Sequence, residues 1–168
     1  MKNLTTRHWG LFFTVVSAAV IAAVYFSQYV LKMSPCHLCL MERVPFYVAV
    51  ILGAWLVVLA ENKIAAKILL GLLVVAFLYS TGLSIFHFGV EQKWWIYVSD
   101  CTGQNTFKRG ASIEEMRAAL KRAPTVRCDQ AVPFLFGMSM AFYNILTSIG
   151  LSALAVIALI TSRNAVRG

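Results

Sequence analysis

Four long apolar runs constrain this chain more than any other feature of its sequence. They cover about residues 9–31, 44–60, 64–90 and 133–160. Roughly 20 helical residues cross the hydrocarbon core of a bilayer, and the shortest run, of about 17, lies at the lower limit. Hydrophobic residues make up 60% of the chain, against about 45–50% in soluble proteins. We therefore expect an all-α membrane protein, a four-transmembrane-helix bundle, with residues 1–168 forming a single domain. The first run is too long for a signal-peptide core and is expected to stay as a signal anchor.

The charge balance is strongly basic, with 15 Lys+Arg against 7 Asp+Glu and a net charge of +8. These basic residues flank the apolar runs or lie in one polar segment. That placement suits anionic lipid headgroups, so we expect the lipid bilayer, and no nucleic acid, as their partner.

All four cysteines lie in the connections between the apolar runs. Residues 32–43 form a short loop with Cys36 and Cys39, and residues 91–132 form a long polar segment with Cys101 and Cys128. With four spans, the first and third connections lie on one face of the membrane and both termini on the other. All four cysteines therefore share one side.

The long segment also carries a helix signal. Ser112 to Glu115 read as a capping box, a pattern that opens helices. Ile113, Met116 and Leu120 follow on one face, and Pro124 ends the pattern. We expect a short amphipathic helix on the membrane surface; a helix packed only against its own loop is the alternative.

Charge leaves the orientation open. Nine Lys/Arg lie on the cysteine side and six on the other, so a raw count of positive charges puts the cysteines in the cytoplasm. The six are packed close to the spans, whereas the nine are spread over a longer, partly acidic stretch. The density of positive charge therefore favours placing the termini in the cytoplasm and the cysteines on the other side, and we adopt this orientation. The six are Lys2, Arg7, Lys63, Lys67, Arg163 and Arg167.

The C-x-x-C motif of Cys36 and Cys39 stands where the second span begins. Two cysteines at this spacing can close a reducible disulfide, and both the motif and a helix N-terminus lower thiol pKa values. If the helix begins near Cys36, Arg43 shares the face of both sulfurs. The alternatives are a zinc half-site for the cysteines and a headgroup anchor for Arg43.

Cys101 and Cys128 stand about 28 residues apart, and a bridge between them would be worth roughly 3–4 kcal/mol. A purely structural bridge is the alternative to a redox one.

A polar stripe follows the third span. Ser80, Ser84, His87 and Glu91 are spaced to share one helix face that leads toward the cysteine loops. Ionisable groups at membrane depth usually face the bundle interior or a site. The alternative is inter-helix hydrogen bonding with an interfacial carboxylate.

These features together resemble a known family. The P-C-x-x-C motif opens the second span, Arg43 follows four residues after Cys39, and His-Phe-Gly-Val-Glu closes the third span. Arg-Cys-Asp surrounds Cys128, and Phe-Gly-Met-Ser-Met opens the fourth span. Over nearly its whole length the chain resembles the bacterial disulfide bond formation protein B (DsbB) family of inner-membrane oxidants.

The resemblance implies a role for each cysteine. Cys101 would be attacked by the thiolate of a periplasmic DsbA-like thioredoxin-fold partner. Cys128 would be its bridge partner and would exchange with Cys36. Cys39 would contact the membrane quinone, ubiquinone or menaquinone, with Arg43 and His87 lining the quinone site.

The family also implies the location: the bacterial inner membrane, with both cysteine loops in the periplasm and both termini in the cytoplasm. Glu42 beside Arg43 is a carboxylate that could partly neutralise the cation. The expected activity is oxidation of the partner's dithiol at the expense of quinone, with no metal. Two rivals remain, a non-catalytic membrane scaffold with structural disulfides and a Cys-ligated zinc membrane protein.

Reporter fusions test the topology. Alkaline phosphatase folds only in the periplasm, so a fusion at the C-terminus should be inactive and one inserted near Gly110 active. Enzyme activity of the two fusions is the measurement, with immunoblots to match their expression. The opposite pattern would put the cysteines in the cytoplasm and favour zinc.

Overall fold

The computed structural model describes residues 2–33, 35–95, 114 and 137–167. Its helices are α1 (Lys2–Tyr29), α2 (His37–Met41), α3 (Val44–Val58), α4 (Lys63–Glu91) and α6 (Met140–Arg167). Four segments are long and apolar enough to cross a membrane: Thr6–Tyr29, His37–Val58, Lys63–Glu91 and Met140–Ser162. This confirms the all-helical, four-span prediction. Of the amphipathic helix expected after residue 112, only residue 114 is among the described residues, so that helix stays a prediction.

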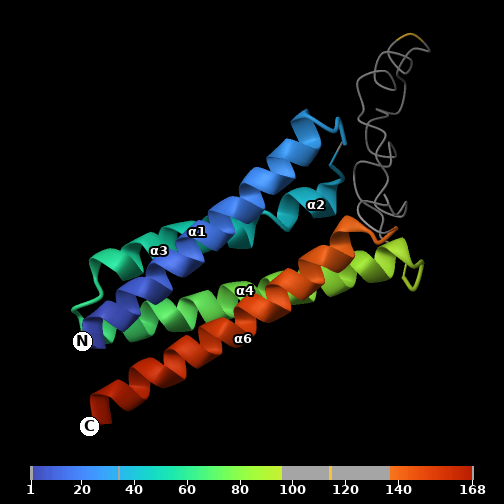
Figure 1. The fold of residues 1–168 in the computed structure, drawn as a ribbon. Helices are drawn as coiled ribbons and strands as arrows, with labels where there is room; N and C mark the ends of the chain where they lie inside the picture. Colours follow the sequence, from blue (N-terminus) through green and yellow to red (C-terminus); the bar gives the residue numbers. More distant parts are fainter. Residues whose placement is uncertain (1, 34, 96–113, 115–136, 168) are drawn as a thin grey trace.

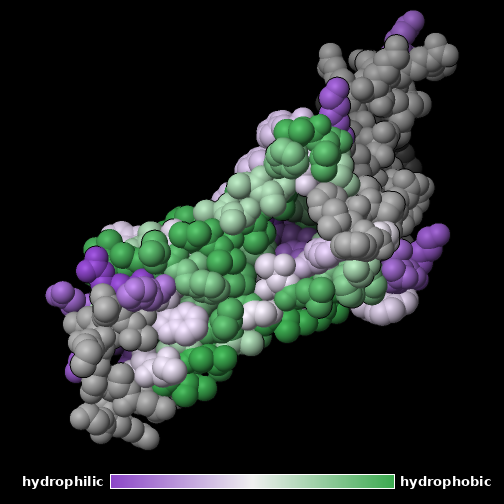
Figure 2. Space-filling view, in the orientation of Figure 1, coloured by the Kyte–Doolittle hydropathy of each residue, from purple (hydrophilic) through white to green (hydrophobic). Residues whose placement is uncertain are grey.

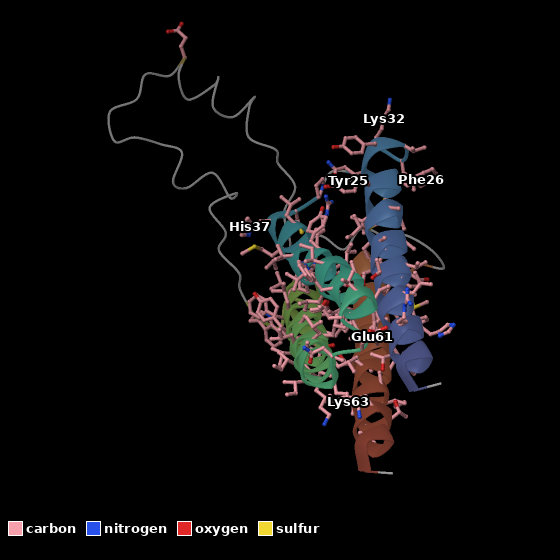
Figure 3. All side chains as sticks on the ribbon, turned by 90° about the vertical axis from the view of Figure 1, so that its left-hand side faces the viewer. Tyr25, Phe26, Lys32, His37, Glu61 and Lys63 are labelled. Atoms are coloured by element: carbon pink, nitrogen blue, oxygen red, sulfur yellow. The ribbon has the colours of Figure 1, made fainter. Side chains whose placement is uncertain are left out.

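The helices run back and forth between two ends of the bundle. The start of α1, the end of α6 and the turn from α3 to α4 lie at one end, and α2 and the end of α4 lie at the other (Figure 1). Lys32 and His37 accordingly lie toward the opposite end from Glu61 and Lys63 (Figure 3). Helix α1 packs mainly on α3, and α4 on α6, while contacts between α3 and α4 join the two pairs.

The face of the helices seen in Figure 2 is largely apolar. Large apolar side chains such as Val58 and Ile64 are each 73% exposed. Inside, Phe13, Leu56 and Phe77 are fully buried, and they belong to one hydrophobic core that all four long helices share. Hydrocarbon supplies no hydrogen bonds, so the backbone N–H and C=O groups of a chain with this surface must pair with one another. Helices achieve this pairing within each segment.

The second span is broken into two helices. Residues 42 and 43 form a turn between α2 and α3, and the Arg43 N–H bonds the carbonyl of Leu40 rather than that of Cys39. Pro45 explains the break, because it has no N–H and its ring would clash with the carbonyl four residues earlier, that of Met41. The turn sets α2 apart as a short element that can face a different helix from α3.

Two glycines allow α1 and α3 to cross closely. A Cβ on Gly53 would lie 2.5 Å from Thr14 Oγ1 and 3.0 Å from the Gly10 carbonyl oxygen. A Cβ on Gly10 would in turn meet the Gly53 carbonyl oxygen at 2.9 Å. Small residues that let backbones approach are typical of helix contacts in membranes.

A valine at this crossing should separate the two helices. We expect Gly53→Val to destabilise the protein by about 1–3 kcal/mol, the usual cost of overpacking, and to lower the temperature at which it unfolds in detergent. Gly71→Val is the matched control, because a Cβ on Gly71 meets nothing within 4 Å. Equal unfolding temperatures for the two variants, measured by size-exclusion chromatography after heating, would contradict this packing.

Candidate functional site

Two cysteines meet at the start of α2. Cys36 is the N-cap residue of the helix, and its Sγ accepts a hydrogen bond of 3.2 Å from the Cys39 N–H. The two Sγ atoms lie 2.7 Å apart and are not bridged. A disulfide is about 2.05 Å long, so the pair can close with a shift of less than about 1 Å. Cys36 is buried, whereas Cys39 is partly exposed.

His87 of α4 lies between this pair and Glu42. Its Nε2 is 3.5 Å from Cys36 Sγ, and its Nδ1 is 2.9 Å from Glu42 Oε1. All three residues are buried, at 2% exposure for His87, 5% for Cys36 and 7% for Glu42. In the neutral ring, an Nδ1–H donated to the carboxylate leaves Nε2 as an acceptor for the thiol. The network joins α2 and the turn after it to α4.

A second carboxylate lies close to the same ring. Glu91 Oε1 is 3.8 Å from His87 Nε2, too far for a hydrogen bond, and the Glu91 side chain is 6% exposed. Its Oε2 atom is buried and has no partner among the described residues. Two carboxylates thus flank one imidazole at the outer end of the bundle.

The cysteine environment differs from the sequence expectation. The neighbouring Cys39 thiol and burial raise the pKa of Cys36 to about 12, while the contact with His87 acts in the opposite direction. The expectation that the C-x-x-C motif and the helix N-terminus lower thiol pKa values is therefore wrong for Cys36. The N–H groups of a five-residue helix do not offset removal of the sulfur from water.

The Arg43 side chain contacts helix α1. Its Nη1 donates a 2.9 Å hydrogen bond to Gln28 Oε1, and its guanidinium carbon lies 5.3 Å from the centre of the Tyr25 ring. Both partners belong to α1. Cys36 and Arg43 thus contact different helices, α4 and α1, and Cys36 is the extended N-cap residue of α2 rather than part of the helix.

One atom of Arg43 is unpaired. Its Nε is buried without a hydrogen-bond partner among the described residues. A buried donor of this kind is costly unless something accepts from it. A carbonyl oxygen of a bound ligand fits this requirement.

The contacts of Glu42 resolve a question that the sequence left open. Glu42 neither pairs with Arg43 nor faces headgroups; it is buried and bonds His87.

The polar stripe on α4 has two parts. Ser80 Oγ lies 2.9 Å from Ser148 Oγ, and Ser84 Oγ accepts a 2.8 Å hydrogen bond from the side-chain amide of Asn144. These two serines join α4 to α6, which is the inter-helix hydrogen bonding given above as the alternative. His87 and Glu91 instead lie at the end of the bundle that holds the cysteines. Hydrophilic atoms are also visible in a hollow between α1 and α6 (Figure 2).

The zinc alternative can be compared with the geometry. The ligand atoms of Cys36, Cys39 and His87 lie within 4.8 Å of one another. Structural zinc takes four ligands, and two sulfurs on one tetrahedral zinc stand roughly 3.8 Å apart. The observed 2.7 Å separation is too short for such a pair and suits a dithiol that closes to a disulfide.

The structure thus brings together four of the residues singled out in the sequence: Cys36, Cys39, His87 and Glu91. Cys101 and Cys128 lie outside the described residues, so their pairing stays a prediction. Gln28 and Tyr25 were missed. An amide side chain in a span that has no charged residue is the signal that could have found Gln28.

Comparison with protein families identifies one family. The family model described as disulfide bond formation protein DsbB matches residues 6–158. The chain is 25% identical over 140 residues to an uncharacterized protein of Rickettsia prowazekii (strain Madrid E), covering 83% of this chain and 80% of that protein. No solved structure matches.

Proposed function

Because the chain belongs to the DsbB family of disulfide-generating membrane oxidoreductases, we propose that it reoxidises a periplasmic DsbA-like protein and reduces a membrane quinone. The observation that carries this proposal is the pair of sulfurs 2.7 Å apart at one end of a four-span bundle. A pair this close alternates between dithiol and disulfide with little movement of the backbone.

The arrangement of the helices supports a proposed topology with both termini on one side of the membrane. Residues 1–168 form a single membrane domain in the bacterial inner membrane, with residues 32–43 and 91–132 in the periplasm and both termini in the cytoplasm. The basic side chains at the terminal end of the bundle support this orientation. An oxidising compartment around the cysteines is also what persistent disulfides require.

The proposed relay consists of two thiol–disulfide exchanges. A partner thiolate attacks Cys101 Sγ, the bond from Cys101 to Cys128 breaks, and Cys128 leaves as a thiolate. Cys128 then attacks Cys36 Sγ, and Cys39 leaves with the electron pair. Each exchange forms one S–S bond and breaks one, so a pair of electrons moves from the partner to Cys39.

The quinone end of the proposal involves Cys39 and Arg43. A bound quinone supplies an acceptor for two electrons and two protons. Cys39 is the more exposed sulfur of the pair, and the unpaired Arg43 Nε is a donor suited to a quinone oxygen. A fixed cation also stabilises negative charge that develops on that oxygen. His87 borders the site from α4, with its two nitrogens facing Glu42 and Cys36.

Removing Cys128 should stop the relay at its first step. In Cys128→Ser, Cys101 has lost its bridge partner and is a free thiol. Its thiolate should attack the disulfide of a purified, oxidised DsbA-like protein, one partner sulfur should leave as a thiolate, and the mixed disulfide between Cys101 and the partner should accumulate on non-reducing gels. Cys101→Ser combined with Cys128→Ser is the control and should trap nothing. Trapping that depended on Cys36 would reverse the proposed order, and a scaffold with structural disulfides would trap no partner.

Removing Arg43 should impair the quinone end alone. Charge-assisted hydrogen bonds are worth about 1.5–3 kcal/mol, so Arg43→Ala should raise the apparent KM for quinone roughly tenfold or more. Gln28→Ala should act in the same direction but more weakly, because it frees the guanidinium without deleting it. Steady-state reduction at varied quinone concentration is the measurement. Unchanged quinone kinetics, with trapping at Cys101 intact, would place the quinone elsewhere.

A further inference from the structure

Glu42 and His87 have no assigned part in the exchanges described above. We propose that His87 is the proton donor and acceptor for the Cys36 sulfur, and that Glu42 is the positioning residue that holds the imidazole for this transfer. The inference rests on the proposed function in one respect, that Cys36 alternates between thiol and disulfide.

The geometry forms a continuous chain of three groups. Glu42 Oε1 lies 2.9 Å from Nδ1, and Nε2 on the other side of the ring lies 3.5 Å from Cys36 Sγ. A carboxylate that accepts from Nδ1–H fixes the tautomer in which Nε2 faces the sulfur. Proteins activate a thiol or hydroxyl with a base that a third, acidic group orients. Here Cys36 is the thiol, His87 the base and Glu42 the orienting group.

The position of Cys36 creates a need for such a group. The neighbouring Cys39 thiol and burial raise its pKa to about 12. The Cys36 thiol therefore stays protonated at pH 7. A thiol with a high pKa rarely acts as a nucleophile, and its thiolate leaves slowly from a disulfide. A proton acceptor and donor in contact with Sγ relieves both difficulties.

The proton follows the sulfur in both directions. When a Cys101 thiolate attacks Cys128 in a bridge from Cys36 to Cys128, the new bond joins Cys101 and Cys128. Cys36 Sγ then leaves with the electron pair and takes a proton from Nε2 of the protonated His87 ring, which is left neutral with its Nδ1–H on Glu42. When Cys36 and Cys39 close their bridge, the Cys36 proton returns to Nε2 and two electrons leave to the quinone acceptor.

Glu42, rather than Glu91, is the positioning carboxylate. Glu42 makes a hydrogen bond to Nδ1, on the side of the ring away from the sulfur. Glu91 stands 3.8 Å from Nε2 with no hydrogen bond to the ring, and it lies on the same helix as His87. Among the described residues, four ionisable groups surround His87. Cys36, Cys39 and Glu42 belong to α2 and its two cap positions, and Glu91 belongs to α4.

The test measures ionisation of Cys36 without quinone or partner. The full-length protein is reduced in detergent and treated with iodoacetamide between pH 7 and pH 9.5, and mass spectrometry of the peptides gives the alkylation rate of Cys36. This rate follows the thiolate fraction. Wild type is compared with His87→Phe, Glu42→Gln and Glu42→Ala, and Glu91→Gln is the matched control for loss of a carboxylate charge.

The expected result is a graded loss. Because a hydrogen bond to a charged group shifts a pKa by about one unit or more, His87→Phe should slow Cys36 alkylation about tenfold at pH 8 and move its profile to higher pH. Glu42→Ala should approach that loss. Glu42→Gln should fall in between, since its amide oxygen still accepts from Nδ1–H, and Glu91→Gln should change the rate less than twofold, as it makes no hydrogen bond to the ring.

Two results would overturn the proposal. An unchanged Cys36 rate in His87→Phe removes His87 as its base, and equal slowing in Glu42→Gln and Glu91→Gln removes Glu42 as the positioning residue. If His87→Phe does not fold, the comparison of the two glutamine variants decides. Failure of partner trapping or quinone reduction, with this graded loss present, would refute the proposed function and leave the proton transfer standing.

Discussion

The absence of hydrogen-bond partners in hydrocarbon is the constraint on which the rest of the structure depends. Each polar side chain inside the bundle must find a partner on a neighbouring helix or pay a desolvation cost. Ser80 with Ser148, and Ser84 with Asn144, therefore join α4 to α6, and Glu42 with His87 joins the turn after α2 to α4. These pairs fix which helices meet, and at what depth, where apolar packing alone would leave many alternatives.

The turn at residues 42 and 43 contacts two different helices, because Glu42 bonds His87 of α4 and Arg43 bonds Gln28 of α1. Cys36 is the extended N-cap residue of α2, and Arg43 lies in the turn between α2 and α3. The Cys36 sulfur contacts α4, while the guanidinium of Arg43 donates to Gln28 on α1. The Cys36 sulfur and the Arg43 cation lie close together in the sequence, but they contact different helices. A ligand between them would meet groups held by separate, rigid elements.

The two cysteines of the motif are chemically unequal because their surroundings differ. Cys36 is buried against His87, and burial beside another sulfur raises its pKa to about 12. Cys39 is the partly exposed member of the pair. This asymmetry suits a bridge in which one sulfur must be helped through its protonation changes and the other receives the electron pair directly. The same dithiol in water would offer no such distinction.

The sequence by itself determined the elements that depend on local pattern. Hydrophobic length predicts the four spans, parity places the C-x-x-C motif and the long segment together, and the i, i+3 and i+4 spacing predicts that His87 and Glu91 share a face. These properties are set by residues close together in the chain, so they can be read without a fold. The partner of Glu42, the direction of Arg43 and the part of Gln28 were decided by the tertiary structure alone. Each depends on which helix lies opposite, and contacts between residues far apart in the chain decide that.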